Sequence, residues 1–132
     1  MKNQLYFSLI ILLLIIGCGV EPDKDRILLN IVKIDSLKHD SYISLNDTLK
    51  IKLYGLISYD GCSSFSHFED KKQPLQLDLT VWSLRENSNR CSQIVVYLNG
   101  KEYKTLATQS GLYRIIIHQP DHSILKDSLI IN

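Results

Sequence analysis

The cysteines carry the most reactive side chains in this sequence. Cys18 stands alone near the N-terminus, while Cys62 and Cys91 lie in the body of the chain. A nucleophilic cysteine needs a lowered pKa and a nearby base, and His67 follows Cys62 by five residues. Two free buried thiols, a metal-binding pair and a disulfide are the other readings of Cys62 and Cys91. The choice among them depends on whether the compartment is oxidising.

The histidines and their acidic neighbours suggest a metal site only weakly. His67 and Glu69 are spaced as His-x-Glu, and His118 and His122 flank Pro120 in a turn. Neither Cys-x-x-Cys nor His-Glu-x-x-His spacing occurs. We therefore expect surface histidines, no metal ion, no cofactor and no enzymatic activity.

The aromatic residues are the best candidates for ligand contacts. Trp82 falls on the polar side of an alternating segment, where an exposed ring could stack on a sugar or anchor a partner. In the alternative, which we favour, Trp82 packs beneath a long connection that carries Phe65 and Phe68. These three residues form the candidate contact set.

An apolar segment precedes everything else in the chain. Lys2 is followed by the apolar run 5–16, and Gly17 puts a small residue before Cys18. A charged start, a short apolar core and a small-residue exit are typical of a secretory signal peptide. Twelve helical residues span only about 18 Å, well short of a hydrocarbon core of about 30 Å.

Residues 15–18 resemble the lipobox of bacterial lipoproteins. Ile15 stands where that motif usually has leucine, and Gly17 and Cys18 match its small residue and its cysteine. The resemblance implies cleavage after residue 17 and acylation of Cys18, for example with palmitate, which would anchor the chain to a membrane. Acidic residues in the polar segment 18–26 resemble the surface-export signal of lipoproteins from Bacteroidetes. Outer-membrane or cell-surface localisation follows, with a periplasm-facing position as the alternative.

An envelope location bears on the remaining cysteines. The compartment is oxidising, and with Cys18 committed to lipid an even pair is left. We expect a Cys62–Cys91 disulfide, which on the chain-entropy model stabilises the fold by about 3–4 kcal/mol.

The charge balance points away from polyanion binding. Without the 17-residue leader, 14 basic residues face 14 acidic ones, and the charges are scattered along the sequence. We expect no nucleic-acid partner. The cluster 69–72 has mixed signs and is typical of a solvated turn.

Short alternating segments dominate the chain after residue 26. We expect about seven strands, and residues 48–57 and 75–84 alternate most clearly between apolar and polar side chains. Further strands are expected at 27–34, 42–45, 92–98, 103–107, 111–118 and 123–131. Residues 59–74 are expected to form a long connection. Asn99-Gly100 predicts a hairpin, because both residues tolerate the positive φ of a type I′ turn.

The last third of the chain resembles the final strands of bacterial immunoglobulin-like domains. Asn-Gly-Lys at 99–101 is followed by Gly111-x-Tyr113 and a Pro-Asp turn, and in those domains a Gly-x-Tyr opens the penultimate strand. Together with the short strands, this predicts an immunoglobulin-like antiparallel β-sandwich over 27–132, with a small β-barrel as the alternative. The organisation is then a signal peptide at 1–17, a flexible tether at 18–26 and one domain.

These observations predict a non-catalytic binding or structural module anchored to the membrane. Its partner would be a glycan or a protein. The alternative is an inhibitor or assembly subunit that presents the 59–74 connection to a protein. Three Asp-Ser/Thr-Leu tripeptides, at 35–37, 47–49 and 127–129, resemble the O-glycan acceptor signal of Bacteroidetes envelope proteins.

Overall fold

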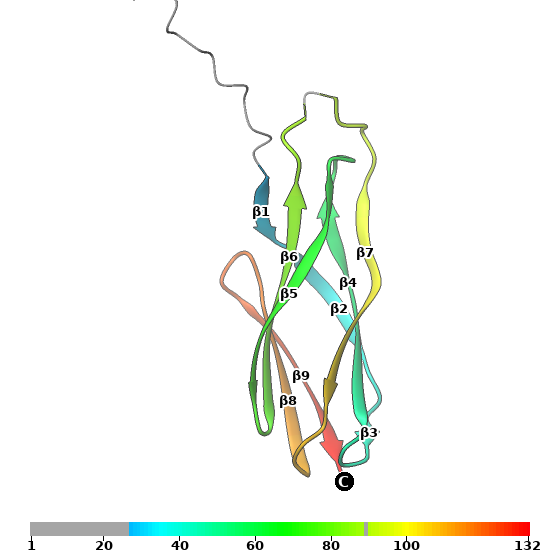
Figure 1. The fold of residues 1–132 in the computed structure, drawn as a ribbon, viewed down its shortest axis with the longest axis vertical. Coiled ribbons are helices and arrows are strands. Elements are labelled where there is room, and N and C mark those ends of the chain that lie inside the picture. Colours follow the sequence, from blue (N-terminus) through cyan, green and yellow to red (C-terminus); the bar gives the residue numbers. More distant parts are fainter. Residues whose placement is uncertain (1–26, 89) are drawn as a thin grey trace, which may run out of the picture.

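The computed structural model describes residues 27–88 and 90–132, which form an all-β sandwich of two sheets (Figure 1). The expected all-β sandwich is confirmed, although two of its strand pairs are parallel rather than antiparallel. The barrel alternative is wrong because the two sheets remain separate. The predicted signal peptide, the tether and Cys18 lie outside the described residues. No helix long and apolar enough to cross a membrane occurs in the described part of the chain.

The larger sheet has six strands. Its strands are β1 (Leu28–Ile31), β3 (Tyr42–Ile43), β5 (Ser63–Gln73), β6 (Gln76–Arg85), β8 (Gly111–His118) and β9 (Ile124–Ile131). β6 is central, with β5 along one edge and β1 and β8 sharing the other. β9 and β3 continue the sheet beyond β8.

The smaller sheet has three strands, β2 (Lys33–Lys38), β4 (Thr48–Ser58) and β7 (Val96–Leu106), in the order β2-β4-β7. β4 shows why these segments form strands. Leu49, Ile51 and Leu53 are buried, while Lys50 and Lys52 between them are exposed. Side chains alternate across a strand, so this sequence covers one face of a core and leaves the other in water.

The first predicted strand is divided between the sheets. β1 pairs with β6 and β2 pairs with β4, so the chain changes sheet at Val32. The backbone N–H of Val32 still donates to Val81 in the larger sheet. Gly55 permits the close approach of the two strands at this crossing, because a Cβ there would clash with the Lys33 carbonyl oxygen. Apolar patterning alone does not mark such a crossing, so the prediction of one strand at 27–34 was wrong.

The predicted Asn99–Gly100 hairpin is also wrong. β7 runs straight through these residues, and the strands predicted at 92–98 and 103–107 are parts of this one strand, which begins at Val96. Gly100 has φ of 68° where the register with β4 shifts, so the positive-φ residue forms a β-bulge. The ten residue pairs that β7 forms with β4 outweigh the local turn preference.

Residues 59–74 are not a long connection. Only 59–62 link β4 to β5, and β5 pairs with β6 along its whole length. The segment escaped recognition because β5 lies at a sheet edge and has charged residues on most exposed positions. The mixed charges at 69–72 therefore stand on a strand rather than in a turn. Together with the division at Val32, this gives nine strands where about seven were expected.

A buried amide joins the two sheets at the β8–β9 turn. The Gln119 side chain accepts from the Ile34 N–H at 3.0 Å and donates to the Ile34 carbonyl at 2.9 Å. It thereby completes the hydrogen bonds of Ile34 as a neighbouring strand would. Tyr113, from the Gly-x-Tyr sequence, is buried two residues after Gly111 opens β8.

Candidate ligand-binding face

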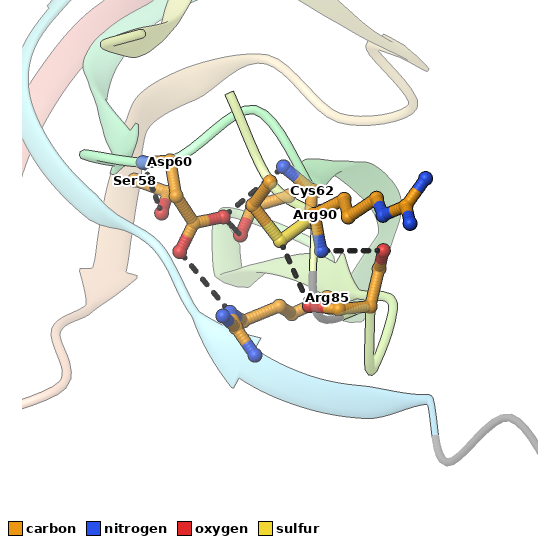
Figure 2. Close-up of a disulfide and its surroundings, with 8 residues drawn as sticks. Ser58, Asp60, Cys62, Arg85 and Arg90 are labelled. Carbon is orange, nitrogen blue, oxygen red and sulfur yellow. Dashed lines mark hydrogen bonds and ion pairs between the residues drawn. A yellow bond between two sulfur atoms is a disulfide. The ribbon is translucent and has the colours of Figure 1, made fainter. Parts of the chain in front are cut away.

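The Cys62–Cys91 disulfide is present, with a Cα–Cα distance of 5.2 Å (Figure 2). Cys62 belongs to the 59–62 connection from the smaller sheet to the larger one. Cys91 belongs to the 86–95 connection, which returns from β6 to β7. The bond thus ties together two crossings at one end of the sandwich. We call residues 59–62, 86–88 and 90–97 the disulfide end.

Asp60 organises the polar contacts beside the disulfide. Its carboxylate accepts from the Arg85 guanidinium at 3.1 Å, the Cys62 N–H at 3.1 Å and the Ser63 hydroxyl at 3.3 Å. Figure 2 shows Asp60 between Cys62 and Arg85. The hydrogen bond from Arg85 is the main reason that the pKa of Asp60 lies below its usual value. An ionised carboxylate with three donors holds a turn in place.

The disulfide removes the thiol from the candidate Cys62/His67 pair. His67 lies on β5, where its ring packs parallel to Trp82 and its Nδ1 lies 2.9 Å from the Ser66 hydroxyl. The nucleophilic pair considered from the sequence therefore does not form.

The histidines considered as metal ligands are separated in the structure. Glu69 accepts a hydrogen bond from Trp82, the His118 ring lies 3.4 Å from Asp78, and His122 occupies the β8–β9 turn at φ of 64°.

Within 27–88 and 90–132, the one trio of potential ligand atoms close together is Asp60, Cys62 and Cys91. Its two sulfurs are bonded to each other, so this trio offers no thiolate to a metal.

Trp82 lies on the outer surface of the larger sheet. Its neighbours Val81 and Ser83 are buried, while Trp82 itself is half-buried. The indole N–H donates to Glu69 at 2.7 Å, and the ring lies 6.2 Å from the His67 ring at an interplanar angle of 11°. Both partners come from β5, so the pairing of β5 with β6 fixes the orientation of the indole. We call the outer surface of β5, β6 and β8 the tryptophan face.

The predicted packing of Trp82 beneath Phe65 and Phe68 is wrong. Phe68 pairs with Val81 and Phe65 with Ser83, residues on the buried side of β6. The two phenylalanines lie 4.9 Å apart and pack against the core, where Phe68 meets Tyr103 edge-on at 5.4 Å. An extra residue at Ser66 in the bulge puts His67, rather than a phenylalanine, opposite Trp82. Of the three candidate contacts, only Trp82 belongs to the outer surface.

A depression lined by polar residues lies on the tryptophan face and reaches Glu69, the hydrogen-bond partner of Trp82. It has a volume of about 430 Å³, and its lining includes Glu69, Gln76, Asp78, Thr80 and His118. The Asp78 carboxylate accepts from the Gln76 amide at 2.9 Å and lies 3.4 Å from the His118 ring. A second depression of about 590 Å³, over β8 and β9, also reaches Gln76. Hydrogen-bonding side chains from three strands therefore line a hollow beside an aromatic ring.

The smaller sheet has a different outer surface, which the scattered charges of the sequence concealed. Lysines from all three strands are exposed there: Lys33, Lys38, Lys50, Lys52 and Lys104. The register places Lys38 opposite Lys52 and Lys50 opposite Lys104, while Lys33 lies further along, opposite Leu56. Lys104 is the largest cause of the lowered pKa of Glu102, and Lys50 and Lys52 contribute. A chain close to neutrality therefore has a surface on which lysines outnumber the acidic residue Glu102, which pairs with Lys104 at 3.0 Å. The alternation of Lys50 and Lys52 was the local signal for it.

Comparison with known proteins identifies no relative. No protein-family model, no curated protein and no solved structure matches the chain. Functional inference therefore depends on the residues and their geometry.

Proposed function

We propose that this protein is a membrane-anchored envelope lipoprotein whose domain binds carbohydrate, without catalysis, on the tryptophan face. The observation that carries the proposal is Trp82, oriented by Glu69 and His67 at the margin of a polar depression. An aromatic ring offers the apolar C–H face of a sugar a surface for stacking. Carboxylate and amide side chains such as Asp78 and Gln76 are good partners for hydroxyl groups.

The shape of the site supports an extended ligand. The two depressions share Gln76, so together they extend from β5 across to β9. A chain of sugars can lie along such a surface, where polar side chains can bind its hydroxyl groups and the apolar wall formed by Leu112 and Ile116 can contact its C–H faces. The anchor proposed at Cys18 would hold this binding surface at the membrane.

Trp82 is the chain's only tryptophan, so its emission should report directly on binding. We expect titration with a panel of neutral oligosaccharides to change the emission of the native protein saturably. Isothermal calorimetry should then show binding at least about tenfold weaker in Trp82→Ala, the loss typical of an aromatic contact. Tyr54→Ala on the opposite sheet is the matched control, with unchanged affinity. Equal affinity in Trp82→Ala, or no ligand in the panel, would count against the site.

A protein-binding role is the second candidate, in a changed form. The segment 59–74 was expected to be a connection that binds a partner. Most of it is strand β5, which pairs with β6 along one edge. Among the described residues no strand pairs with its other edge. An extended peptide could add there as a further strand. Removal of one β5 edge charge outside the depression, by Lys72→Ala, should weaken binding of such a partner and leave sugar binding intact.

A further inference from the structure

The disulfide end has large apolar side chains in water. Tyr59 is 75% exposed, Tyr97 64% and Ile94 56%, and Val95 is exposed as well. They lie close together: Ser58, next to Tyr59, pairs with Val96, and Gly61 lies against Ile94. Contiguous apolar and aromatic residues on a protein surface mark an interaction site more often than single ones do.

The same end receives the chain from its N-terminus. Ile27 and Leu28, both exposed, precede and begin β1, and Leu28 pairs with Arg85. Figure 1 shows the start of β1 beside the end of β6, at the same end of the sandwich as the beginning of β7, with the C-terminus at the far end. Arg85 is neutralised by Asp60, so its charge does not separate the two groups of apolar residues.

The length of the preceding segment brings this end close to any anchor at Cys18. Nine residue steps separate Cys18 from Ile27, and even a fully extended chain covers only about 30 Å over that distance. The opposite end lies further away by the length of β4, about 36 Å for eleven residues. Tethering over such a distance gives an effective concentration of millimolar order, so weak adsorption suffices.

We propose that the disulfide end docks on the lipid surface of the membrane, with Tyr59, Ile94, Val95 and Tyr97 at the level of the headgroups. This proposal rests on the anchor at Cys18 that belongs to the proposed function. Tyrosine suits the interface, because its ring is apolar and its hydroxyl stays hydrated. Docking at this end would leave the tryptophan face, which runs along the strands, open to ligand from the side.

The test uses the full-length chain and places a fluorescent reporter at each end of the sandwich. In a Trp82→Phe background, Tyr59→Trp reports on the disulfide end and Tyr42→Trp, 68% exposed in the native chain, reports on the opposite end. The Cys18 thiol is coupled to a maleimide lipid in phosphatidylcholine vesicles. Coupling fixes the anchor point whether or not the cell acylates Cys18, while Cys62 and Cys91 remain bonded. Intact mass of the native protein decides acylation separately.

Brominated acyl chains in the vesicles should quench most of the emission of the tryptophan at 59 and leave that at 42 unchanged. Replacing Ile94 and Val95 by aspartate should remove the quenching at 59. Equal quenching at both ends, or none at 59, overturns the proposal. A concentration-dependent shift at 59 without vesicles identifies a second copy as the occupant and overturns it as well.

Discussion

The two ends of the sandwich are closed by different means. At the disulfide end, a covalent bond joins two crossings between the sheets, and Asp60 binds Arg85 beside it. At the opposite end, backbone hydrogen bonds perform the closure: Asn46 donates to Ala107, Ala107 donates to Asp47, and Leu45 donates to Asn132. The described part of the connection, 86–88 and 90–95, has the exposed apolar residues Ile94 and Val95 and no buried side chain. The difference indicates that a disulfide is needed where a connection contributes little to the core.

Among changes at the two ends, removing the disulfide should lower the free energy of unfolding most. Replacing both Cys62 and Cys91 by serine frees a loop of 29 residues, and we expect a loss of about 3–4 kcal/mol in the free energy of unfolding. Denaturant unfolding measures it. Reduction of the native protein should lower its stability by a similar amount. Unchanged stability would mean that the backbone bonds at Gly61 and Glu86 already close this end.

The opposite end should depend on one backbone conformation. Asn46 has φ of 66° in the 44–47 turn and is exposed, so its substitution tests the backbone alone. Asn46→Ala should cost about 1–2 kcal/mol, because most side chains disfavour the left-handed region. Asn46→Gly is the control and should retain full stability. If alanine and glycine are equally stable in thermal melts, the turn does not restrain this end.

The ion pair of Asp60 and Arg85 should have the smallest effect and a characteristic pH dependence. The pKa of Asp60 is lowered below 3.8, so its stabilisation is present above that pH and is lost as pH falls through the lower folded value. Asp60→Asn should therefore have a lower free energy of unfolding than the native protein at pH 7. The two free energies of unfolding should become equal in acid. Salt should narrow the difference at pH 7, since the pair is partly exposed. A gap that persists in acid would assign the effect to packing rather than charge.

The predicted glycan acceptors provide a check on the surface of both sheets. Ser36, Thr48 and Ser128 are all exposed, as an acceptor hydroxyl must be. We expect the intact mass of protein isolated from its native cells to exceed that of the processed chain by whole sugar units. Replacing all three residues by alanine should remove the excess. A native mass without added sugar would contradict the prediction.

Predictions from the sequence were correct where the feature depends only on neighbouring residues, and wrong where it depends on pairing with a distant strand. The alternation in β4 and β6 predicted both the strands and their buried faces, because side-chain direction depends only on neighbouring residues. Asn99–Gly100 misled for the same reason. Its preference for positive φ was read correctly, but whether a positive φ makes a turn or a bulge depends on pairing with β4, some 50 residues away in sequence.

The sequence alone therefore determined the class of fold, most strand positions and the disulfide, and its first 18 residues predict an anchor. The tertiary structure alone decided which sheet each strand joins, and hence which side chains share a surface. It packed Phe65 and Phe68 against the core, put His67 and Glu69 beside Trp82, and placed five lysines on the outer surface of the smaller sheet. Those placements depend on register between strands distant in sequence, and a one-residue shift such as the bulge at Ser66 changes which side chain faces outward.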